Sequence, residues 1–202
     1  MKKYIYLISP QKIRGNKFYN ELDKILKTKK VKYFQLRIKK ISNPNLIKIS
    51  NKIKKIVKKN NVKFIINDIP AIAKKIGADG CHVGQKDLDY KSSRKILGEK
   101  KIIGITCHNS INLAKQAIAN GANYLALGAF YSSKTKKTKY KATIKILKLA
   151  KKITNTPIVA IGGINQNNYK KLLLNKANFL ANSGYIWNNK NLNPKDALNR
   201  LK

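Results

Sequence analysis

Eight short runs of apolar residues recur along the chain, and each is followed by a segment with the spacing of an amphipathic helix. The runs are near-continuously hydrophobic, which is typical of parallel strands buried on both faces. Alternation of this kind predicts a parallel α/β architecture. Eight repeats in 202 residues fit a (β/α)8 TIM barrel that forms one domain over residues 1–202, and a doubly wound open sheet is the alternative. The expected strands are 4–8, 33–36, 64–66, 80–83, 101–105, 123–127, 157–161 and 179–181, and the expected helices are 16–26, one from about 42–44, 70–77, 92–97, 110–119, 142–153, 166–174 and 193–201.

Charge is the unusual feature of the composition. Lys and Arg number 45 against eight Asp and Glu, which gives a formal net charge of +37. The lysines are spread over every expected helix, and arginine, the better reader of phosphates and bases, occurs only four times. We therefore expect a solvated lysine coat and no specific nucleic-acid partner, with an overall charge that attracts polyanionic substrates.

Two cysteines, Cys81 and Cys107, lie in or beside apolar runs without the spacing of metal ligands. The N-terminal apolar run is too short for a secretory signal, and no stretch of about 18 apolar residues could cross a membrane. A reduced, cytoplasmic protein without a membrane partner is the expectation.

Two of the eight carboxylates follow neighbouring strands of an expected βαβ unit. Asp68 comes after the third run and Asp87 after the fourth. Parallel strands place their carboxyl ends on the same side of the sheet, so the two side chains are expected at the rim where α/β proteins bind ligands. Paired carboxylates there suit a hard cation such as Mg²⁺. The alternative is that both residues only cap loops, with Asp68 at a helix N-terminus.

Further polar residues collect after the other strands. Arg37, Lys39 and Lys136 are cations that suit the oxygens of a diphosphate bridged to that metal. Gly162 and Gly163 follow the seventh strand and Ser183 follows the eighth, where barrels commonly bind a monophosphate. His108 is expected to be a structural residue of the rim. The loop over residues 129–141 is long for a compact domain, which is typical of functional or mobile loops.

The motifs at these strand ends resemble those of thiamine phosphate synthases, in family order over nearly the whole chain. Residues 77–87, GADGCHVGQKD, are similar to the family's GADGVHLGQED almost residue for residue. The other similar segments are QLRIK at 35–39, IND at 66–68, GITCH at 104–108, GAFYSSKTK at 128–136 and PIVAIGGI at 157–164.

The resemblance implies a (β/α)8 transferase that joins 4-amino-2-methyl-5-(diphosphomethyl)pyrimidine to a thiazole phosphate, carboxylated or not. Diphosphate leaves first in the family's route, and the thiazole nitrogen attacks the resulting cation. The implied roles, residue by residue, are Mg²⁺ on Asp68 and Asp87; diphosphate on Arg37, Lys39, Asn67 and Lys136; pyrimidine on Gln35 and Thr106; the thiazole side on Ser133 and Thr135; and thiazole phosphate on Gly162, Gly163, Asn182 and Ser183.

Some residues depart from the family pattern. Ile38 replaces Glu, Thr106 replaces Ser but keeps the hydroxyl, and Asn182 stands where an apolar residue is usual. Three alternatives stay open: a related thiazole tautomerase in which His108 shuttles a proton, a non-catalytic barrel, and a basic barrel that binds nucleic acid with strong salt dependence. The oligomeric state is also open, and a homo-oligomer is one outcome.

Overall fold

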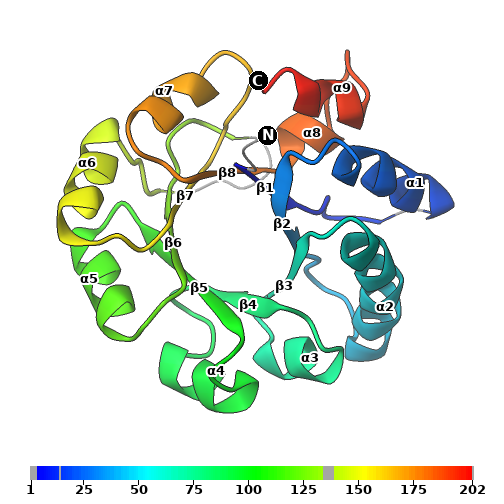
Figure 1. The fold of residues 1–202 in the computed structure, drawn as a ribbon, viewed down its shortest axis with the longest axis horizontal. Helices are drawn as coiled ribbons and strands as arrows, with labels where there is room; N and C mark the ends of the chain where they lie inside the picture. Colours follow the sequence, from blue (N-terminus) through cyan, green and yellow to red (C-terminus); the bar gives the residue numbers. More distant parts are fainter. Residues whose placement is uncertain (1–3, 14, 134–138, 202) are drawn as a thin grey trace.

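Eight parallel strands close into a barrel in sequence order (Figure 1), as the alternation predicted. The computed structural model describes residues 4–13, 15–133 and 139–201. The strands are β1 (Ile5–Ile8), β2 (Val31–Leu36), β3 (Lys63–Asn67), β4 (Gly80–Val83), β5 (Ile102–His108), β6 (Tyr124–Gly128), β7 (Ile158–Ile161) and β8 (Phe179–Asn182). Because β1 pairs with β8 as well as with β2, no edge strand is left, and the open-sheet alternative is wrong.

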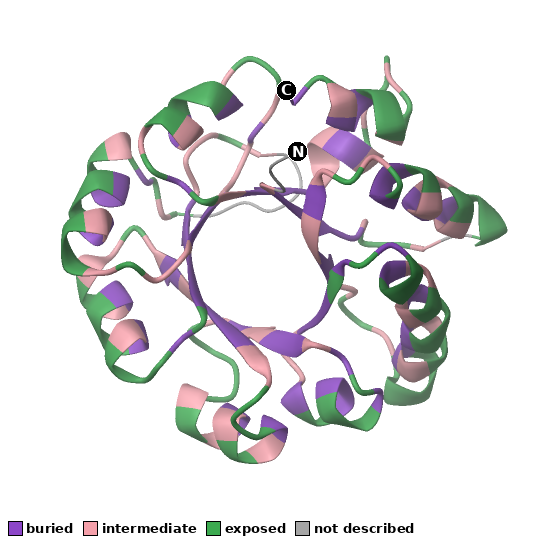
Figure 2. Ribbon diagram, viewed as in Figure 1, coloured by how far each residue is buried: buried purple, intermediate pink, exposed green. Residues whose placement is uncertain are grey.

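Helices surround the barrel and cover its outer face. Within the described residues they are α1 (Gly15–Leu26), α2 (Asn43–Lys59), α3 (Pro70–Lys75), α4 (Tyr90–Leu97), α5 (Ile111–Ala119), α6 (Ile144–Ile153), α7 (Tyr169–Leu174), α8 (Gly184–Trp187) and α9 (Pro194–Asn199). The longer helices turn their buried side toward the strands and their exposed side outward (Figure 2). None of the described helices has the length and apolar character needed to span a membrane.

The side chains of the strands alternate between two layers, as the period of two requires. Outward residues such as Leu7, Phe34 and Leu125 pack against the helices in one large hydrophobic cluster. Inward residues such as Tyr6 and Tyr124 form a second, smaller cluster inside the barrel. The barrel is therefore filled from within, and its open positions lie at the ends of the strands.

Some predicted boundaries were wrong, and one element was missed. Strand β2 begins at Val31 rather than at residue 33. Helix α4 begins at Tyr90, because the Asp89 side chain accepts a hydrogen bond from the Ser92 backbone and so caps the helix two residues earlier than predicted. Helix α8 was not predicted.

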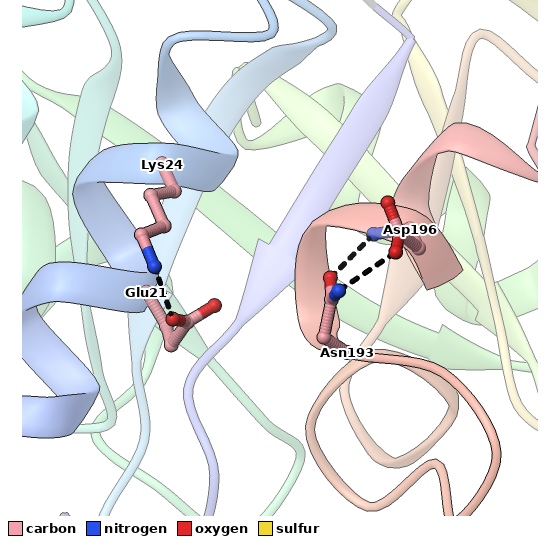
Figure 3. Close-up of polar contacts among 4 residues, drawn as sticks. All are labelled: Glu21, Lys24, Asn193 and Asp196. Carbon is pink, nitrogen blue, oxygen red and sulfur yellow. Dashed lines mark hydrogen bonds and ion pairs between the residues drawn. The ribbon is translucent and has the colours of Figure 1, made fainter.

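The last elements close the ring against the first strand. The Trp187 indole in α8 donates to the Ile8 carbonyl at 2.7 Å, and the Tyr4 hydroxyl donates to the Leu201 carbonyl at 2.6 Å. Helix α9 is capped by Asn193, whose side-chain oxygen accepts from the Asp196 backbone at 2.9 Å (Figure 3). The Glu21–Lys24 pair in the same figure lies on the surface of α1, where an ion pair contributes little to stability.

Candidate active site at the carboxyl end of the barrel

The carboxyl groups of Asp68 and Asp87 meet at the ends of β3 and β4. Asp68 has a left-handed backbone, with φ of 64°, and its N–H donates to the His82 carbonyl of β4 at 2.8 Å. In the turn after β4, the Asp87 Oδ2 atom accepts a hydrogen bond from the Gly84 backbone at 2.7 Å. Burial, together with a hydrogen bond and like charge from Asp87, raises the pKa of Asp68 to about 6.

Neither of these carboxylates caps a helix. The residue at the N-cap of α3 is Ile69, and the cap of α4 is Asp89. The prediction of a helix cap at Asp68 is therefore wrong, and the bond from Gly84 to Asp87 caps only the turn after β4, so the pairing of the two carboxyls needs another explanation. Two carboxylates that face each other at the cost of a raised pKa are typical of a functional site.

The pair fits a cation that takes most of its ligands from elsewhere. Within the described parts of the chain, no group of three or more His, Cys, Asp or Glu side chains could hold a metal ion. Mg²⁺ commonly binds one or two carboxylates and completes its shell with water and substrate phosphates. The two oxygen-donor side chains at Asp68 and Asp87 suit that ion.

Cationic side chains lie beside the pair. Arg37 and Lys39 follow β2, and the positive charge of each lowers the pKa of Asp68, although less than burial and Asp87 raise it. The Arg37 backbone is fixed by Ser9, which is buried after β1 and whose hydroxyl accepts from the Arg37 N–H at 3.0 Å. Sequence reasoning missed Ser9, because its partner lies on another strand end.

The candidate pyrimidine-binding residues Gln35 and Thr106 lie on strands β2 and β5, and the candidate diphosphate ligand Asn67 lies on β3. Asn67 ends β3 and is half-buried, and Gln35 is 2% exposed within β2. The Thr106 hydroxyl of β5 is 2.8 Å from His82 Nε2, and the Gln85 side chain donates to the Thr106 carbonyl. Gln35, Asn67 and Thr106 thus all lie at or near the carboxyl ends of their strands, on the side of the barrel where the carboxylate pair lies.

Gly162 and Gly163 follow β7 and pack closely against the segment after β6. Both have left-handed φ angles, 104° and 60°. A Cβ atom on Gly162 would lie 2.4 Å from the Ala129 Cβ, and one on Gly163 would lie 2.2 Å from the Ser132 carbonyl oxygen. The two glycines therefore allow the backbones of these segments to touch, which leaves Gly162 and Gly163 N–H groups near the rim.

The end of β8 is joined to the end of β1. The Ser183 hydroxyl donates to the Ser9 carbonyl at 3.0 Å. Asn182 is 2% exposed, and its side-chain nitrogen and oxygen have no hydrogen-bond partner among the residues that the structure describes. Because Ala181 belongs to the inner cluster, Asn182 points toward the helices, so only its backbone could reach a ligand inside the rim.

His108, at the end of β5, stacks on Tyr140. The ring centroids are 3.9 Å apart and the planes differ by 16°. The neighbouring Asn109 side chain donates to the Lys141 carbonyl at 3.1 Å. These contacts fix the far end of the 129–141 loop, which agrees with a structural role for His108. Ser133 is half-buried, and the predicted ligands Thr135 and Lys136 lie outside the described residues.

Comparison with known proteins decides the family. A family model described as thiamine monophosphate synthase matches residues 5–186. The chain belongs to the thiamine monophosphate synthase family. A thiamine-phosphate synthase of Pelagibacter ubique is 62% identical over 201 residues, which cover 100% of this chain and 97% of that protein. One of Erythrobacter litoralis is 38% identical over 187 residues, covering 91% and 87%.

Solved structures agree on the fold of this thiamine monophosphate synthase family member. Thiamine phosphate pyrophosphorylase from Pyrococcus furiosus superposes with a TM-score of 0.86 at 21% identity, covering 98% of this chain and 93% of that one. This likeness confirms the prediction of a TIM barrel. The family model and the curated relatives confirm the resemblance to the family.

Proposed function

We propose that the protein is a thiamine phosphate synthase, a transferase that joins a (diphosphomethyl)pyrimidine to a thiazole phosphate and releases diphosphate. Two findings support this proposal. The chain belongs to the family, and the paired carboxyls of Asp68 and Asp87 lie beside Arg37 and Lys39. Such a set matches a diphosphate, because acidic oxygens hold a cation while Arg and Lys bind the phosphate oxygens.

Asp68 and Asp87 are the residues that would hold Mg²⁺. When bound, the ion neutralises charge on the diphosphate and makes it a better leaving group. Arg37 and Lys39 add donors to the same oxygens, and Asn67 and Lys136 extend this set in the proposal. The energetic role of these residues is electrostatic, since negative charge grows on the diphosphate as its bond to carbon breaks.

The pyrimidine is oriented by Gln35 and Thr106 in the proposal. Loss of diphosphate leaves a cation at the exocyclic methylene carbon, stabilised by the electron-rich aminopyrimidine ring. Attack by the thiazole nitrogen then forms the new carbon–nitrogen bond. The residues have to align the two rings and exclude water, because water would otherwise capture the cation.

The thiazole phosphate is placed on the opposite side of the rim. Gly162 and Gly163 with the backbone of Asn182 and Ser183 supply its N–H donors, and Ser133 and Thr135 contact the thiazole. Left-handed glycines and strand-end N–H groups are a usual way of binding a phosphate in a barrel.

The test is release of diphosphate by the purified protein, measured with both substrates, with either alone, and with and without Mg²⁺. The expected result is release only when both substrates and the metal are present. The matched pair of variants is Asp87→Asn, which should lose turnover, and Asp89→Asn, which keeps a good cap on α4 and should not. Conversion of a thiazole carboxylate tautomer without diphosphate release would instead favour the tautomerase.

A further inference from the structure

A chain of hydrogen-bonded side chains crosses the inside of the barrel below the site. The Tyr6 hydroxyl of β1 is 2.7 Å from the Tyr124 hydroxyl of β6, and Tyr124 is 3.0 Å from Nδ1 of His82 in β4. Nε2 of His82 then reaches the Thr106 hydroxyl at 2.8 Å. At the other end, the Gln35 side chain lies beside the Tyr6 hydroxyl, whose pKa it lowers against the larger effect of burial.

The two ends of this chain are the residues assigned to the pyrimidine. Gln35 and Thr106 lie on strands that are not neighbours, β2 and β5, yet they are joined through three interior side chains. A side-chain amide can be turned over and a hydroxyl proton can rotate, so neither group has a fixed polarity by itself. Hydrogen bonds to buried partners remove that freedom.

The backbone of three neighbouring strands leaves room for this chain of hydrogen bonds. His82, Gly104 and Tyr124 are in register across β4, β5 and β6. A Cβ atom on Gly104 would lie 1.9 Å from the Tyr124 ring, so only glycine lets the ring lie across β5. The ring then stacks on the His82 imidazole, with centroids 5.6 Å apart and planes 10° from parallel.

We propose that His82 is a positioning residue, which fixes the Thr106 hydroxyl in the orientation that the pyrimidine needs and is itself fixed by Tyr124 and Tyr6. This inference rests on the proposed function. His82 does not need to touch the reacting atoms, and its two ring nitrogens face different partners, one toward the interior and one toward Thr106. The pyrimidine site is therefore ordered before substrate arrives, which lowers the cost of aligning it.

The experiment uses two substitutions that separate the two ring nitrogens. The amide of His82→Asn reaches about as far as Nδ1 and can keep the bond to Tyr124, whereas that of His82→Gln reaches about as far as Nε2 and can keep the bond to Thr106. We expect His82→Asn to lower kcat/KM for the pyrimidine diphosphate roughly tenfold to a hundredfold with an unchanged KM for the thiazole phosphate, and His82→Gln to recover most of that loss.

Two controls make the result specific. Tyr33 belongs to the same aromatic cluster, and its ring centroid is 5.7 Å from that of Tyr124. Tyr33→Phe removes a hydroxyl that makes no hydrogen bond within the described residues. Its kinetics should match those of the wild type. In a Thr106→Ala background, His82→Asn should cause little further loss, because it acts through the missing hydroxyl.

The outcomes distinguish this inference from the proposed function. A wild-type protein that releases no diphosphate contradicts the function itself. An active wild type with equal losses in His82→Asn and His82→Gln, or with additive losses in the Thr106→Ala background, contradicts the positioning role alone. If His82→Asn does not fold, Tyr124→Phe replaces it; a smaller loss confined to the pyrimidine diphosphate supports the role, and unchanged kinetics reject it.

Discussion

Replacing Gly104 by alanine should destabilise the barrel far more than the addition of one methyl group suggests. The new Cβ would lie 1.9 Å from Cζ and 2.3 Å from the hydroxyl oxygen of Tyr124. Ordinary contacts between carbon atoms are about 3.5–4.0 Å, so the ring has to move by about 1.5 Å or more. The Tyr6 ring lies 5.5 Å away and the His82 ring 5.6 Å away, which leaves little room for such a shift.

The magnitude follows from two contributions. Overpacking of a filled core costs roughly 1–3 kcal/mol, and displacing the Tyr124 hydroxyl from Tyr6 and His82 costs about 1 kcal/mol for each bond, which gives roughly 3–5 kcal/mol in total. For a chain of this size the unfolding midpoint should fall by roughly 5–20 °C. Urea unfolding and thermal unfolding, followed by circular dichroism, measure both quantities.

Relief of the clash is the decisive control. Tyr124→Leu should be destabilising alone, but Gly104→Ala should cost much less in that background, because the atoms that it would meet are gone. Gly15→Ala provides the comparison: this glycine has φ of 56° and open space around its Cβ position, so its cost comes from the backbone and should not depend on Tyr124. Additive losses at positions 104 and 124, within about 0.5 kcal/mol, would refute the reasoning.

Three further predictions concern the charges of the rim. Asp68→Asn should abolish turnover and raise the unfolding midpoint of the metal-free protein at pH 7. The reason is that the pKa of Asp68 is raised in the folded state, so its ionised form opposes folding above pH 6. The gain in the unfolding midpoint should therefore shrink as the pH falls to 4. Asp87→Asn should raise the Mg²⁺ concentration needed for half-maximal turnover at least about tenfold while the circular dichroism spectrum stays unchanged. The net charge of +37 should attract the pyrimidine diphosphate, and salt screens this attraction, so kcat/KM for that substrate should fall as NaCl rises from roughly 20 to 300 mM. A rate that does not change with NaCl would contradict electrostatic steering.

The sequence pattern was enough for the barrel because the decisive signals are local. The runs at β1 and β6 are apolar over consecutive residues, and the helices that follow carry their own periodicity. The meeting of Asp68 and Asp87 could also be predicted, since parallel strands of one βαβ unit place their ends side by side. Helix α8 was missed because four residues are too few to show a helical period.

The interior chain of hydrogen bonds lay beyond the sequence for a different reason. Tyr6 and Tyr124 are 118 residues apart, and nothing near either residue specifies its partner. Only Gly104 carried a signal, because a glycine inside an apolar strand often marks a close approach of another group. The stacking of His108 on Tyr140 was hidden in the same way, since the two rings are brought together by a long loop.

The two polar features of the barrel should act on stability with opposite sign. At the rim, burial and like charge make ionised Asp68 unfavourable in the metal-free protein, so removing its charge should stabilise the fold while it destroys the proposed metal site. Inside the barrel, the hydroxyls of Tyr6 and Tyr124 are buried and hydrogen-bonded to each other, so removing either hydroxyl takes one hydrogen bond from the buried hydroxyl that remains and should destabilise the fold. We therefore expect the interior chain of hydrogen bonds to support both folding and substrate orientation, and the carboxylate pair to support the proposed reaction at a cost in stability.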